Sequence, residues 1–114
     1  MKILLISTDL MASSQIQGAA MSLGAELVTC SPETAIMSAA AESPTLVVID
    51  LTANVEDIAA VVSAAGEQPV VAFGPHVHKK KLAAAAEAGC AEVFTRGKFC
   101  RTAAKIFSRY SPAA

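Results

Sequence analysis

The stretch TLVVIDL, residues 45–51, is a β-branched apolar run with one carboxylate, Asp50, near its carboxyl end. A continuous apolar run of this length is typical of a strand that is buried on both faces, as the strands of parallel sheets are. Four shorter runs resemble it: KILLIS at 2–7, ELVTC at 26–30, PVVAF at 69–73 and AEVFT at 91–95. The sequence therefore predicts five strands.

Helical segments are expected between these strands and after the last one. They are a helix from Thr8–Ser14 to Gly24, a helix capped by Ser31 that runs to Glu42, a helix capped by Asn54 that runs to Ala65, and helices at Val77–Ala88 and Lys98–Tyr110. Single helices between strands imply right-handed crossovers and a parallel sheet. We therefore expect one α/β domain over residues 1–114, a three-layer doubly wound (βα)5 fold, with Ser111–Ala114 fraying at its end.

Composition excludes several protein classes. Apolar residues make up 54% of the chain and charged residues 17%, which excludes a disordered polypeptide. Aromatic residues make up only 4%, so we expect aliphatic side chains to fill the core. No apolar run approaches the roughly 18–20 residues that span a bilayer, so we expect a cytoplasmic protein with no membrane partner. The odd number of cysteines and the lack of a CxxC motif favour partly buried free thiols at Cys30, Cys90 and Cys100.

The loops after the strands resemble those of the receiver domain of bacterial response regulators. TLVVIDL is similar to the family's phosphoacceptor strand, with Asp50 at the acceptor position. PVVAFGP at 69–75 and AAAAEAGCAEVFTRGKF at 83–99 are similar to its fourth strand, fourth helix and fifth strand. The resemblance covers essentially the whole chain. It implies a flavodoxin-like receiver fold with strand order 2-1-3-4-5 and a role in signal transduction through a phosphorelay.

The sequence departs from the family at the residues that perform its chemistry. The family holds Mg²⁺ with the acceptor Asp and an acidic pair after the first strand, and it uses a Ser or Thr after the fourth strand and a Lys after the fifth. Here Ser7 and Thr8 stand at the acidic pair, Asp9 lies one place late, Gly74 replaces the hydroxyl residue and Arg96 replaces the Lys. Mg²⁺ normally takes carboxylate ligands, so Asp50 with neutral hydroxyls is a poor anchor. We therefore expect a non-enzymatic pseudo-receiver without a cofactor, with Mg²⁺ only if Asp50 is a working phosphoacceptor.

Other interpretations stay open. Asp50 with Asp9 and Arg96 would make a divergent phosphoacceptor, or Asp50 is a structural carboxylate that pairs with Arg96 or caps the following loop. The polar start of a helix at Thr8–Ser14 can bind an anion, which suggests a small-ligand-binding flavodoxin-like protein with a pocket over Ser7–Asp9 and His76. The spacing of His76 and His78 suits a metal pair, but no third ligand is evident nearby, so we interpret both as loop and helix-cap residues.

Charge is distributed unevenly along the chain. The formal net charge is −1, but residues 1–78 carry eight acids and one base, whereas residues 79–114 carry eight bases and two acids. The candidate partner face consists of Lys79, Lys80 and Lys81 at the start of one predicted helix and Lys98, Arg101, Lys105 and Arg109 along one stripe of the last. Aromatic side chains for base stacking are missing there. We therefore expect a protein partner, possibly acidic, or a second copy of the chain, rather than nucleic acid.

Overall fold

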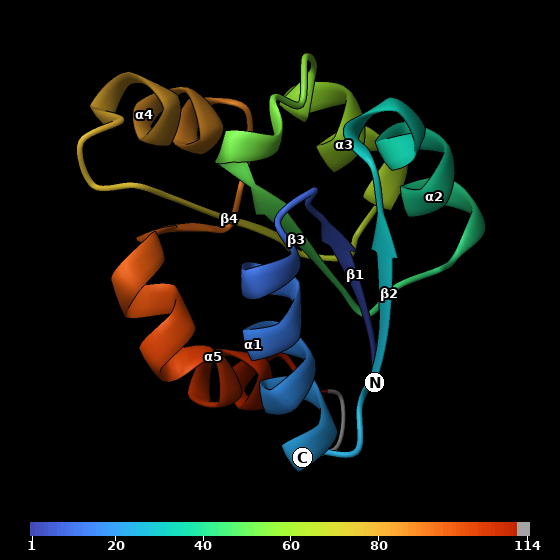
Figure 1. Ribbon diagram of the computed structural model, residues 1–114. Helices are drawn as coiled ribbons and strands as arrows, with labels where there is room; N and C mark the ends of the chain where they lie inside the picture. Colours follow the sequence, from blue (N-terminus) through green and yellow to red (C-terminus); the bar gives the residue numbers. More distant parts are fainter. Residues whose placement is uncertain (112–114) are drawn as a thin grey trace.

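The computed structural model describes residues 1–111 and consists of one parallel sheet with helices on both faces (Figure 1). The strands are β1 (Lys2–Ile6), β2 (Glu26–Cys30), β3 (Leu46–Asp50), β4 (Val70–Gly74) and β5 (Glu92–Thr95). The helices are α1 (Leu10–Ser22), α2 (Ala35–Ala41), α3 (Ile58–Ala65), α4 (Lys79–Glu87) and α5 (Arg96–Tyr110), with short 3-10 helices η1 (Pro32–Thr34) and η2 (Leu51–Ala53). The strand order β2-β1-β3-β4-β5 confirms the predicted fold.

The central strands are buried on both faces because helices cover the sheet on each side. All five residues of β3 and all five of β4 are buried. Alternate residues of β1 point to opposite sides, so Ile3 and Leu5 pack toward α1 and α5, whereas Leu4 and Ile6 pack toward α2 and α3. These two apolar layers place the carboxyl ends of all five strands, and the loops that follow them, at one end of the molecule.

The aromatic side chains are few, but they gather in one layer. All four phenylalanines of the chain are buried on the side of the sheet that α1 and α5 cover. Phe73 on β4 stacks on Phe99 of α5 with ring centroids 4.7 Å apart, and Phe107 meets Phe99 edge-on at 6.0 Å. The expectation of an aliphatic core therefore holds only for the layer under α2, α3 and α4. The aromatic cluster fixes α5 against the sheet.

The starts of α3 and α5 differ from the predicted ones because other residues cap them. Asn54 adopts a left-handed conformation with φ of 59° at the end of η2, and α3 begins only at Ile58, where the Asp57 carboxylate accepts a hydrogen bond from the Ala60 amide at 2.9 Å. Thr95 caps α5 by accepting from the Lys98 amide, so that helix begins at Arg96 and not at Lys98. A side-chain oxygen at the N-cap, from Asp57 in α3 and from Thr95 in α5, starts each helix.

The other helix boundaries lie close to the expected ones. Ser31 is an N-cap as predicted, but of the 3-10 helix η1 that precedes α2, and its side chain makes no capping hydrogen bond there. The helix expected from Val77 begins at Lys79. Gly24 has a positive φ of 68° after α1, as predicted from its place behind that helix.

Several composition-based expectations also have an outcome in residues 1–111. The three cysteines are free and partly buried, as expected. Among the helices of these residues, none combines the length and the apolar character that crossing a membrane requires. The expected frayed end falls largely on residues 112–114, which lie outside the described residues.

Candidate functional site

Asp50 and Ser7 meet at the carboxyl end of the sheet. Asp50 ends β3 and Ser7 directly follows β1, and these two strands are neighbours with Ile6 opposite Ile49. The Ser7 hydroxyl donates to Asp50 Oδ2 at 2.8 Å. Asp50 is 1% exposed and Ser7 is 5% exposed, and they are the two buried polar residues among residues 1–111. Asp50, the residue at the predicted acceptor position, therefore carries a buried carboxylate.

The other oxygen of Asp50 belongs to the loop that follows it. Asp50 Oδ1 accepts from the Thr52 amide at 3.0 Å and from the Thr52 hydroxyl at 2.7 Å. A side-chain oxygen that binds the backbone two residues on forms an Asx-turn, and this turn opens η2. These contacts agree with the interpretation of Asp50 as a carboxylate that caps the following loop. Thr52 was not singled out from the sequence, although a hydroxyl residue two places after an Asp is a recognisable signal for such a turn.

Asp9 has two partners, one for each carboxylate oxygen. Asp9 Oδ1 caps α1 by accepting from the amides of Met11 at 2.9 Å and Ala12 at 3.3 Å. Asp9 Oδ2 forms an ion pair with Nη2 of Arg96. The hydrogen bond from Arg96 is the main cause that lowers the pKa of Asp9, and the Ala12 and Met11 amides lower it further. The same contact with Asp9 raises the pKa of Arg96.

Arg96 lies at the mouth of the site but pairs with Asp9, not with Asp50 as one interpretation expected. The reason is the start of α5, which packs beside α1 and carries Arg96 as its first residue, next to the N-cap of α1. The Asp9 amide also donates to the Ser7 hydroxyl at 3.1 Å. A continuous chain of contacts therefore runs from Arg96 through Asp9 and Ser7 to Asp50.

Gly74 ends β4, and its side of the site is filled by Leu51. A Cβ atom on Gly74 would lie 3.2 Å from Leu51 Cβ and 3.3 Å from Leu51 Cδ1, which is closer than ordinary contact. A Ser or Thr at this position would therefore have to displace Leu51. Nothing in the sequence pointed to Leu51, because its position over Gly74 depends on the turn that Asp50 and Thr52 form.

Both carboxylates at the carboxyl ends of β1 and β3 already have hydrogen-bond or ion-pair partners. Mg²⁺ needs carboxylate oxygens that are free to bind it in octahedral geometry. The oxygens of Asp50 accept from Ser7 and Thr52, and those of Asp9 accept from α1 and Arg96. Thr8, the other residue at the expected acidic pair, is exposed. Within residues 1–111, no group of three or more His, Cys, Asp or Glu side chains is arranged to hold a metal ion, His76 and His78 included.

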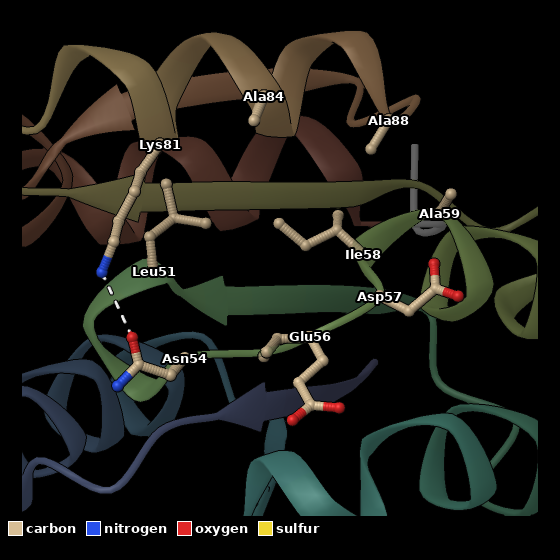
Figure 2. A pocket seen from close by; sticks show the side chains of 10 residues that line it. Leu51, Asn54, Glu56, Asp57, Ile58, Ala59, Lys81, Ala84 and Ala88 are labelled. Atoms are coloured by element: carbon tan, nitrogen blue, oxygen red, sulfur yellow. Dashed lines mark hydrogen bonds between the residues drawn. The ribbon is translucent and has the colours of Figure 1, made fainter.

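Two hollows lie on the side of α2, α3 and α4, away from the expected ligand pocket. The first, about 490 Å³, lies between the β3–α3 loop, α3 and α4, where Leu51 and Ile58 face Ala84 and the Lys81 ammonium donates to Asn54 Oδ1 at 3.2 Å (Figure 2). The second, about 280 Å³, is lined in part by residues of η1, α2 and the β3–α3 loop. Neither of these two hollows is lined by Ser7–Asp9 or His76, where the ligand-binding hypothesis expects a pocket.

The basic residues of the candidate partner face are exposed, but two of them have partners. Lys79, Lys80 and Lys81 are exposed on the first turn of α4, and Lys98, Arg101, Lys105 and Arg109 are exposed on α5. Arg109 forms an ion pair with Glu92 at 3.1 Å, and Lys81 bonds to Asn54. Thr102 has a non-helical backbone inside α5, so the predicted stripe bends there.

Comparisons with known proteins agree on the fold. No protein-family model matches the sequence, and no curated protein matches it significantly. A response regulator from Hahella chejuensis superposes with a TM-score of 0.78 at 16% identity, over 98% of this chain and 96% of that one. The receiver domain of sensor histidine kinase PA1611 from Pseudomonas aeruginosa, solved with a magnesium ion in its active site cleft, gives 0.77 at 17% identity, over 96% and 95%. A CheY-like protein (tadZ) from the same organism gives 0.76 at 17%, over 100% and 95%. The chain therefore has the fold of response-regulator receiver domains.

Proposed function

We propose that this chain is a non-catalytic pseudo-receiver, a signalling or scaffold module that acts through protein contacts and not by accepting phosphate. The observation that carries the proposal is the engagement of both carboxylates at the carboxyl end of the sheet. Asp50 is buried under hydrogen bonds from Ser7 and Thr52, and Asp9 is bound to Arg96. No carboxylate at this site is therefore free to take the metal that the PA1611 receiver domain holds in its cleft.

Charge supports the same conclusion. A carboxylate that attacks an anionic phosphodonor needs compensating positive charge, which a bound metal ion supplies when present. The cation nearest to the site here is Arg96, and its guanidinium is already committed to Asp9. Exposing Asp50 also means breaking its bonds to Ser7 and Thr52, each worth about 0.5–1.5 kcal/mol net. Phosphorylation of Asp50 is thus opposed both by the lack of a free cation and by the hydrogen bonds that bury its carboxylate.

The packing at Gly74 supports a module that does not switch by the route the resemblance implies. The family's hydroxyl residue after the fourth strand would belong at Gly74, but Leu51 occupies the space into which its side chain would extend. No hydroxyl at position 74 would therefore be available to hydrogen-bond to a phosphoryl group on Asp50. We infer that the surface this chain offers to partners is the same at all times.

The partner that fits this surface is a protein with an acidic contact region. The charged residues of α4 and α5 that make no ion pair among residues 1–111 are mostly basic, and they include Lys79, Lys80, Lys98, Arg101 and Lys105. We place the module in the cytoplasm, which suits its three free cysteines. The alternative function is a divergent phosphoacceptor, and an experiment must distinguish it from the pseudo-receiver.

Incubation with acetyl phosphate and Mg²⁺, followed by intact-mass measurement, separates the two functions. We expect no phosphate adduct on the wild-type chain or on Asp50→Asn. The PA1611 receiver domain in the same mixture serves as the positive control for the reagent. An adduct on the wild-type chain that disappears in Asp50→Asn would overturn the proposal, because it would show that Asp50 opens and reacts.

A further inference from the structure

Exposed apolar side chains gather at one end of the molecule. We define the carboxyl-end face as the loops and first helical turns that follow the five strands. Seven large hydrophobic residues are exposed in residues 1–111, and five lie on this face: Leu10, Met11, Ile36, Met37 and Val77. Leu10 is 85% exposed and Met11 is 74% exposed. Exposed apolar residues scattered singly need no explanation, but five of seven at one end is a concentration that burial against another molecule would explain.

The same face has an acidic half and a basic half. Glu33 and Glu56 follow β2 and β3, are exposed, and line the same hollow. Lys79 and Lys80 follow β4 and Lys98 follows β5, and all three are exposed. These five residues take part in none of the ion pairs found within residues 1–111. In the strand order β2-β1-β3-β4-β5 the acidic residues follow β2 and the central strand β3, and the basic residues follow β4 and β5, so the two groups lie on different sides of the face.

Such a charge distribution is complementary to itself. A twofold axis that lies in the plane of the face, perpendicular to the line from β2 to β5, places the acidic half of one copy on the basic half of the other. By symmetry, the basic half of the first copy also meets the acidic half of the second. Both charge contacts therefore form in the same dimer, and no half is left over to bind a third copy. Leu10 and Met11, at the start of α1, follow β1, which lies between β2 and the central strand β3.

We propose that the carboxyl-end face pairs two copies of this chain in a closed twofold dimer. The molecule measures 33 × 29 × 25 Å, so one of its ends offers an area of the order of the ~800 Å² per partner that stable interfaces bury. A facing acidic surface also offsets the unfavourable placement of Lys79 and Lys80 at the positive end of the α4 dipole. This inference goes beyond the proposed function: of the basic residues offered there to a partner, it assigns Lys79, Lys80 and Lys98 to a second copy of the chain, whereas Arg101 and Lys105 stay available to another protein.

Sedimentation of charge-reversal variants tests the dimer. For the wild-type chain we expect a concentration-dependent species that stops at twice 11.7 kDa and weakens as salt is added. Lys79→Glu/Lys80→Glu and Glu33→Lys/Glu56→Lys should each raise the dissociation constant about a hundredfold or more, since like charges facing each other cost several kcal/mol. An equimolar mixture of the two variants should pair again, and so should the variant that carries all four substitutions. Circular dichroism shows whether each variant is folded.

Matched controls reverse exposed charges elsewhere. Glu67→Lys lies beyond the carboxyl end of α3, and Lys105→Glu lies in the second half of α5, so both should leave the dimer intact. A wild-type chain that stays monomeric, a species larger than a dimer, pairing that survives either double reversal, or folded variants that fail to pair when mixed would each overturn the inference. A monomer that takes up no phosphate would leave the pseudo-receiver standing, whereas a phosphorylated dimer would remove only the pseudo-receiver.

Discussion

The Arg96 guanidinium and the Asp9 carboxylate form an ion pair that joins the first residue of α5 to the N-cap of α1. The other oxygen of Asp9 holds the first turn of α1, so one side chain fixes a helix start and neutralises the cation at the mouth of the site. The two residues are 87 positions apart in the sequence.

The ion pair makes stability depend on acid pH through Asp9. Arg96 lowers the pKa of Asp9 below its ordinary value near 3.8, so the paired carboxylate stabilises the fold above that value. This contribution is lost as the pH falls below about 4 through the lowered pKa. Asp9→Asn keeps a good N-cap but removes the charge. Urea unfolding should show the wild type more stable than Asp9→Asn at neutral pH, with the difference shrinking in acid.

A difference between wild type and Asp9→Asn that stays constant from pH 7 into acid would contradict this account. Asp57→Asn is the matched control, because Asp57 caps α3 in the same way but belongs to none of the ion pairs of residues 1–111.

Removal of the Ser7 hydroxyl should destabilise the fold by leaving Asp50 Oδ2 buried without its donor. The bond is 2.8 Å long and both residues are buried. A buried acceptor without a partner costs about 1–3 kcal/mol, so Ser7→Ala should lower the free energy of unfolding by that amount. Ser14→Ala, an exposed position on α1, is the control and should change it by less than about 0.5 kcal/mol. Equal effects of the two variants in urea titrations would refute the role of Ser7.

Gly74→Ser should be destabilising, although it restores the residue type that the family resemblance implies. The new Cβ would lie 3.2 Å from Leu51 Cβ, and overpacking of this kind costs about 1–3 kcal/mol. Adding Leu51→Ala removes the Cδ1 and Cγ contacts at 3.3 and 3.7 Å but keeps the one to Cβ, so a double-mutant cycle should give a favourable coupling energy that offsets part of the cost. Additive effects of the two substitutions would show that Leu51 does not restrict this position.

Tyr110 should ionise at unusually high pH. Burial and the hydrogen bond from its hydroxyl to Glu92 raise its pKa to about 12. The tyrosinate absorbance reports this residue alone, because the chain has one tyrosine and no tryptophan. A raised pKa means that the contact stabilises the fold below about pH 10 and that the effect is lost as the pH rises toward 12. Glu92→Gln should lower the midpoint but not to the ordinary value, since burial is the larger cause; an unchanged midpoint would contradict the contact.

The strands and their order were predictable because each strand is a continuous apolar run, and a parallel sheet needs such runs. The burial of the four residues from Leu46 to Ile49 follows directly from the apolar composition of TLVVIDL, whereas that of Asp50 depends on its hydrogen bonds. Helix starts were harder, because Asp57 and Thr95 compete with nearby capping candidates such as Asn54. Local hydrogen bonding selects among such candidates, and it depends on backbone angles that composition does not specify.

The sequence predicted which of the candidate site residues lie at the carboxyl end of the sheet, but not which of them contact one another. Ser7, Asp9, Asp50, Gly74 and Arg96 do lie at one end of the sheet, as the strand ends required. The partner of Arg96 was open, because Asp9 and Asp50 are both carboxylates near the start of α5. The packing of α1 beside α5 brings Arg96 to Asp9, and that arrangement depends on the aromatic cluster around Phe99. Thr52 and Leu51 become part of the site only through the turn after β3.

Magnesium binding, measured on the amide resonances of the isotope-labelled chain, tests the central claim most directly. With the oxygens of Asp9 and Asp50 held by Arg96, Ser7 and Thr52, millimolar Mg²⁺ should leave the amides of these residues unshifted. Saturable shifts confined to the loops after β1 and β3, present in the wild type and missing in Asp50→Asn, would contradict the account.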